Sequence, residues 1–132
     1  MCTARPLFWM SLVVLAGCAS NRTGNGTFNA HISSPFDIVE AVVTGDSLWT
    51  TLRYGGGFRT HTFALEATGA ATKSLPRQQP LRLVHDADGD MGRALISEDR
   101  SFDLRPFRDP GRGMIVLRLE GWHGRLEYTY TP

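Results

Sequence analysis

The chain has 132 residues, of which 42% are apolar and 20% charged, and this composition excludes a disordered polar tail. Its 14 Lys and Arg residues against 13 Asp and Glu residues give a formal charge of +1, which removes the usual electrostatic argument for a nucleic-acid partner. A chain of this length is typical of one domain. We therefore expect one globular domain and no nucleic acid among its partners.

An apolar segment opens the chain. Arg5 and the amino terminus supply positive charge, and residues 7–17 are apolar apart from Ser11. This stretch is too short for a permanent membrane span, which needs about 20 apolar residues. It has the length of the apolar core of a secretory signal, about 7–15 residues, and the small residues Ala16 and Gly17 suit a cleavage site. The segment therefore predicts a signal peptide over residues 1–17.

The end of this segment, Leu15-Ala16-Gly17-Cys18, resembles the lipobox of bacterial lipoproteins. The resemblance implies that diacylglycerol is joined to the sulfur of Cys18, that the chain is cleaved after Gly17, and that the new amino terminus is acylated. Because residue 19 is Ala and not Asp, the resemblance also implies the outer membrane, on its periplasmic face. Two or more acyl chains would make such an anchor stable. The alternative is a buried N-terminal strand or helix with an inert cysteine.

The lipobox resemblance also has consequences for both cysteines of the chain, Cys2 and Cys18. Cys2 would leave with the signal peptide and Cys18 would be acylated, so the mature chain would have no disulfide, cysteine-bound metal or thiol nucleophile. Residues 18–34 are small, polar and rich in Gly and Asn, which predicts a flexible lipidated tether. The folded domain is then expected over residues 35–132.

The rest of the chain has the period of two that is typical of strands. The segment at residues 36–44 could also form a helix, with Ser34 and Asp37 as a capping box, but its β-branched residues favour a strand. Gly55, Gly56 and Gly57 are expected to end the second strand as a bulge or wide turn, and residues 67–80 to form a loop. We expect about seven short strands in an antiparallel, immunoglobulin-like β-sandwich, or else a small barrel. The expected strands are residues 36–44, 48–54, 60–66, 81–85, 94–104, 115–119 and 126–130, of which 94–104 is either one bent strand or a pair.

One further pattern spans the middle of the chain. It consists of Tyr54, the glycines at 55–57, Phe58, His61 and Phe63, followed by His85, Asp86, Gly89, Asp90 and Gly92. It resembles a pattern in small secreted bacterial β domains of unknown function. We associate cysteines with the positions near Phe58 and Gly92 in those domains, and this chain lacks them. The resemblance implies no activity.

His61 and His85 are the main candidates for a site. Each is expected on the apolar face of its strand, near the strand end and next to a glycine or aspartate turn. The two rings could therefore approach if the strands are neighbours. Imidazole and carboxylate ligands suit zinc or copper, with Asp86, Asp88 or Asp90 completing the set. The alternative is two separate buried histidines that are hydrogen-bonded to the backbone or to the aspartate turn.

Two weaker patterns complete the candidates. Asp86, Asp88 and Asp90 resemble the opening of a calcium loop, but Met91 and Ser97 stand where that loop needs glycine and glutamate, which favours a solvated turn. Trp49, Tyr54 and Trp122 could form a contact surface, since Trp49 falls opposite the apolar face of its strand. For Trp122 the alternative is packing across its hairpin.

The predicted function is that of an outer-membrane lipoprotein whose domain binds or scaffolds an unidentified ligand or protein of the cell envelope. A periplasmic metal-binding protein that uses His61, His85 and the Asp86–Asp90 turn is one alternative. A small hydrolase is the other, although no motif such as Gly-x-Ser-x-Gly nominates a catalytic residue. No cofactor other than zinc, copper or calcium is expected.

Overall fold

The computed structural model describes residues 33–131, so the predicted signal peptide, Cys18 and most of the tether lie outside the described residues. Apart from a short 3-10 turn, the regular structure in this range consists of strands. They are β1 (Phe36–Thr44), β2 (Ser47–Gly56), β3 (Thr62–Ala67), β4 (Gln78–Asp86), β5 (Ala94–Asp103), β6 (Met114–Leu119) and β7 (Leu126–Thr129), with the 3-10 turn η1 (Arg105–Phe107) after β5.

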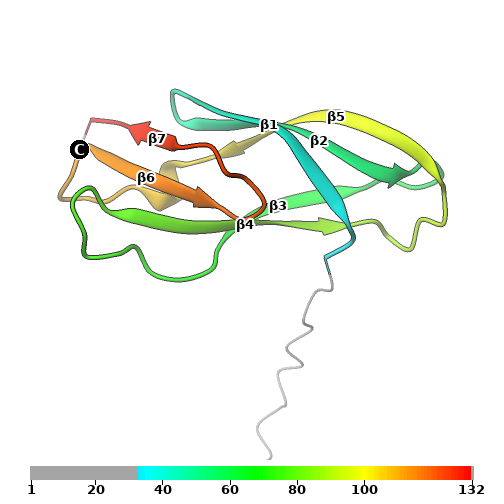
Figure 1. Ribbon diagram of the computed structural model, residues 1–132, viewed down its shortest axis with the longest axis horizontal. Coiled ribbons are helices and arrows are strands. Elements are labelled where there is room, and N and C mark those ends of the chain that lie inside the picture. The colour runs from blue at the N-terminus through cyan, green and yellow to red at the C-terminus, as the bar shows by residue number, and fades with distance from the viewer. Residues whose placement is uncertain (1–32, 132) are drawn as a thin grey trace, which may run out of the picture.

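The strands form two sheets that face one another (Figure 1). One has the order β1-β2-β5 and the other the order β3-β4-β6-β7. The prediction of an all-β sandwich of seven strands is therefore confirmed. In the part of the chain that the structure describes, no helix is long and apolar enough to cross a bilayer.

The core lies between the two sheets and follows from the alternation along each strand. In β2, Leu48 and Leu52 are fully buried, whereas Trp49 between them is 49% exposed on the opposite face. Each fully buried aliphatic side chain stabilises the fold by about 1.5–3 kcal/mol before conformational entropy is subtracted. Trp122 packs against this core, in agreement with the alternative of packing across its hairpin. The largest fully buried side chains are those of Leu48, Leu52, Leu81, His85, Leu104, Ile115, Leu117 and Tyr128.

One pair of strands departs from the predicted antiparallel arrangement. β4 and β6 run parallel, with Gln78 opposite Val116 and Leu81 opposite Leu119. Between them the chain crosses to the other sheet as β5, so β6 returns in the same direction as β4. This pairing also draws residues 78–80 into β4, although the sequence pattern placed them in a loop.

The glycine run ends its strand later than expected. Gly55 and Gly56 still pair with Leu95 and Ala94 of β5, and the chain leaves the sheet only at Gly57, whose φ is +136°. Residues with a positive φ in this region are nearly always glycine, because a Cβ atom would clash with the backbone. Residues 94–103 form a single strand, and residues 36–44 form a strand and not a helix.

Candidate functional site

The rings of His61 and His85 meet inside one end of the sandwich. His85 lies in β4, and His61 lies in the connection between β2 and β3. Nδ1 of His61 lies 2.7 Å from Nε2 of His85, which is hydrogen-bonding distance, and the two residues are only 3% and 1% exposed. The sequence left two outcomes open, approach of the rings if the strands are neighbours or two separate buried histidines, and the structure shows the rings in direct contact.

Asp90 completes the cluster from the connection between β4 and β5. Its Oδ2 atom lies 3.0 Å from Nε2 of His61, and both side chains are almost completely buried. The same oxygen accepts hydrogen bonds from three successive backbone N–H groups, at residues 57–59. Oδ1 accepts a fourth from the N–H of Gly92, at 2.7 Å. The His61 ring and these N–H groups hold the pKa of the Asp90 carboxyl well below its usual range, so Asp90 is the anion of the site.

The other end of the cluster holds the first described residues of the chain. Nδ1 of His85 lies 3.1 Å from the carbonyl oxygen of Ser34. The N–H of Ser34 donates to the carbonyl of His85, and the N–H of His85 donates to Oγ of Ser33. Hydrogen bonds to His85 thus hold the first residues of the sandwich, Ser33 and Ser34, at the histidine cluster.

These contacts define how many protons the two rings carry. The ring contacts run from Asp90 through His61 and His85 to Ser34, and both end groups are acceptors. Each contact needs one N–H, whereas two neutral imidazoles provide only two for the three contacts. The row of contacts therefore needs one proton more than two neutral rings carry, and the Asp90 carboxylate lies at the His61 end of the row. Burial lowers the pKa of His85.

Aromatic side chains enclose the two histidines. Tyr54 stacks on His61 with centroids 4.5 Å apart, and Phe63 stacks on His85 at 4.3 Å. The hydroxyl of Tyr54 donates to Glu98, which lowers the pKa of that carboxyl. Tyr54 comes from β2 and Phe63 from β3, so the cluster joins the two sheets as well as their loops.

Two glycines leave room for the cluster. A Cβ atom on Gly56 would lie 2.5 Å from Nε2 of His61, and one on Gly92 would lie 2.4 Å from the carbonyl oxygen of Gly56. Both distances are far shorter than real Cβ contacts. Gly56 and Gly92 therefore belong to the same site as His61 and Asp90, which the sequence alone did not establish.

The structure separates the five candidate metal ligands into two groups. His61, His85 and Asp90 come together, whereas Asp86 accepts from the N–H of Asp88, and Asp88 forms an exposed ion pair with Arg59. Within residues 33–131, no group of three or more His, Cys, Asp or Glu side chains is arranged to hold a metal ion. The short contact between the rings is that of a hydrogen bond. Binding of zinc, copper or calcium remains a prediction.

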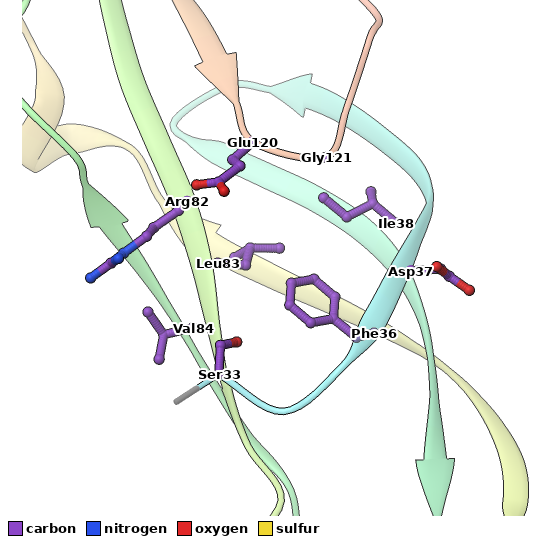
Figure 2. A pocket seen from close by; sticks show the side chains of 9 residues that line it. All are labelled: Ser33, Phe36, Asp37, Ile38, Arg82, Leu83, Val84, Glu120 and Gly121. Atoms are coloured by element: carbon purple, nitrogen blue, oxygen red, sulfur yellow. The ribbon is translucent and has the colours of Figure 1, made fainter. Parts of the chain in front are cut away.

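A separate cleft lies at the side of the sandwich, between the start of β1 and the middle of β4. Figure 2 shows Phe36 and Ile38 pointing from β1 towards β4, with Glu120 and Gly121 at the far end. The cleft has a volume of about 410 Å³. Its apolar wall and its carboxylate could accept a small group of a ligand. It could not be predicted from the sequence, because it is lined by residues of β1, β4 and the segment after β6, which are far apart along the chain.

The comparisons with known proteins concern the fold. No protein-family model matches the chain, and a search of curated proteins finds no match. The fold is similar to that of a NigD-like immunity protein from Bacteroides caccae, with a TM-score of 0.52 and 19% sequence identity over 72% of this chain. The aligned part spans about half (49%) of that protein. At this identity the similarity shows the fold alone: this chain is a small β protein of the same general architecture.

Proposed function

We propose that the protein is a lipoprotein of the bacterial outer membrane whose β-sandwich binds a partner protein at the periplasmic face. The observation that carries this proposal is the sequence Leu15-Ala16-Gly17-Cys18 after a short apolar segment. Acylation of Cys18 would hold the domain at the bilayer through the tether that enters at Ser33. The membrane anchor would then be chemically separate from the binding surface.

The outer face of the β1-β2-β5 sheet supports a binding role. Val42 and Trp49 are cross-strand partners on this face, and both are about half exposed. Beside them lies a shallow depression lined by Glu40, Thr51 and Asp99. Exposed tryptophan next to polar groups is typical of protein interfaces, where its ring contributes a large contact area. We assign this face to the partner, and its two carboxylates favour a partner surface with basic side chains.

The structural neighbour also supports binding. It is described as an immunity protein, and its fold is shared by the described part of this chain. A comparable role for this chain would be protection of the envelope by binding another protein. This role needs no catalytic residue, in keeping with the burial of the histidine cluster.

The anchor is tested by Cys18→Ser. We expect this variant to remain an unprocessed precursor without diacylglycerol, because serine lacks the sulfur to which the lipid is attached. Detection of the lipid-linked form by metabolic labelling with an alkyne fatty acid should give full signal in the natural chain and none in Cys18→Ser. The matched control is Cys2→Ser, which should label fully. Equal labelling of both variants would contradict the anchor.

The binding face is tested by photo-crosslinking in cells. A photoreactive phenylalanine analogue at Val42 should give a discrete crosslink to a protein, whereas the analogue at Glu66, on the exposed face of the other sheet, should not. Adding Trp49→Ala should abolish the Val42 crosslink, because that substitution removes the ring at the centre of the face. A crosslink that persists without Trp49, or that forms equally from Glu66, would contradict this assignment.

A further inference from the structure

Large exposed apolar side chains gather at one end of the sandwich. Phe58 is 84% exposed, Met91 is 87% exposed and Leu95 is 74% exposed. Phe58 lies in the β2–β3 connection, Met91 in the β4–β5 connection and Leu95 at the start of β5. Figure 1 shows these two connections side by side at the right-hand end of the molecule. We call residues 57–61 and 87–93 together the loop tip.

The histidine cluster holds the loop tip in place. Asp90 lies within the second loop and accepts hydrogen bonds from the N–H groups of Gly57, Phe58 and Arg59 in the first. His61, at the end of the first loop, is bound to the same carboxylate. The backbone on either side of the exposed Phe58 and Met91 side chains is therefore fixed by a buried charged group. Single exposed apolar residues are common on protein surfaces, but two on adjoining loops with a shared buried support indicate a contact surface.

The tether enters the fold at the same end. Ser33 and Ser34 are hydrogen-bonded to His85, and His85 is in contact with His61 of the loop tip. Cys18 precedes Ser33 by 15 positions, and the flexible tether expected from the sequence would have an end-to-end distance of about 20 Å at that length. An acylated Cys18 would thus keep the loop tip close to the bilayer, at a high effective concentration.

The charges of the loop tip are compatible with a lipid surface. Within the loop tip, the formal charges of Arg59 and Arg93 balance those of Asp88 and Asp90, so no net negative charge of the loop tip repels anionic lipid. Arg59 is 56% exposed and paired with Asp88. Arginine side chains can place their charged ends among headgroups while apolar neighbours enter the acyl region.

We propose that the loop tip is a second membrane contact, in which Phe58 and Met91 enter the bilayer beside the acyl anchor. This inference rests on the lipid anchor proposed above. It orients the domain: the loop tip faces the membrane, and Trp49, near the opposite end of β2, faces the periplasm. The bilayer is favoured over a protein as the occupant because the anchored tether begins at this end.

The test uses the full chain, expressed in bacteria and purified from membranes, with the mass of each preparation measured first. Phe58→Cys and Met91→Cys are each labelled with an environment-sensitive dye. The matched control is Leu75→Cys, since Leu75 is also exposed (73%) but lies in the connection between β3 and β4 at the opposite end of the sandwich. The labelled proteins are placed in vesicles of phosphatidylethanolamine and phosphatidylglycerol that contain acyl-chain quenchers.

We expect the dyes at positions 58 and 91 to shift to the blue and to lose intensity with the quencher, while the dye at 75 does neither. A dye at Leu95→Cys should lose its quenching when Phe58→Asp and Met91→Asp are added to the same chain. The melting curve of this variant shows whether it is folded. Acylated protein with equal signals at 58, 91 and 75 would overturn this proposal alone. If neither the dye at 58 nor the dye at 91 is quenched in vesicles, but both are buried in native envelopes, the loop tip contacts a protein. That result would also overturn this proposal. An unmodified Cys18 would overturn the anchor and this proposal together.

Discussion

Gly92→Ala should destabilise the domain by about 1–3 kcal/mol, the usual cost of forcing extra volume into a packed site. A Cβ atom at this position would lie 2.4 Å from the carbonyl oxygen of Gly56 and 2.8 Å from the nitrogen of Gly57. Both are backbone atoms, so the clash is relieved only if the end of β2 moves away from the β4–β5 connection. The movement would also disturb the N–H of Gly92, which donates to Asp90. Urea unfolding followed by tryptophan fluorescence measures the effect.

Gly55→Ala is the matched control for that substitution. Gly55 is one residue from Gly56 in the same strand, and a Cβ atom there would meet nothing within 4 Å. Its free energy of unfolding should therefore equal that of the natural chain, or rise slightly because alanine restricts the unfolded chain. Equal effects of Gly92→Ala and Gly55→Ala would contradict the close packing described at the cluster.

Asp90→Asn should be the most damaging polar substitution at this end of the molecule. The carboxylate accepts five hydrogen bonds, from the N–H groups of residues 57–59, from Gly92 and from His61. An amide replaces one accepting oxygen with an NH2 group, which faces N–H donors wherever it is placed. It also removes the negative charge beside the His61 ring. The urea midpoint should fall, and the amide protons of residues 57–59 should exchange faster.

The control for this prediction is Asp88→Asn, two residues away. The Asp88 side chain is 70% exposed and its ion pair with Arg59 is at the surface, where such pairs contribute little to stability. We expect its urea midpoint and amide exchange to match those of the natural chain. If Asp90→Asn behaved in the same way, the histidine cluster would not be the support of the loop tip.

Much of the fold could be predicted from the sequence, because the period of two is a direct consequence of one buried face per strand. The alternation of Leu48, Trp49 and Leu52 correctly assigned the inner and outer faces of β2. The parallel pairing of β4 with β6 could not be predicted in this way. It depends on which sheet each strand joins, and residue alternation does not encode that choice.

The candidate site was predicted in part for a similar reason. His61 and His85 were recognised because each is a polar residue in phase with buried apolar ones. Which aspartate of the turn would join them was not determined by spacing, since the backbone path of residues 86–90 decides it. Ser33 and Ser34 were assigned to the tether, although their hydrogen bonds to His85 make them part of the fold. The support that a buried charge gives to the exposed Phe58 and Met91 is visible only once the two loops are side by side.

The intact mass of the mature protein tests most directly whether its N-terminus is an acylated Cys18 or an uncleaved signal peptide. We predict that protein purified from membranes consists of residues 18–132 carrying a diacylglyceryl group on Cys18 and an acyl group on its amino terminus. A polypeptide that retains residues 1–17, or that has a free thiol at Cys18, would contradict the membrane anchor and the assigned compartment.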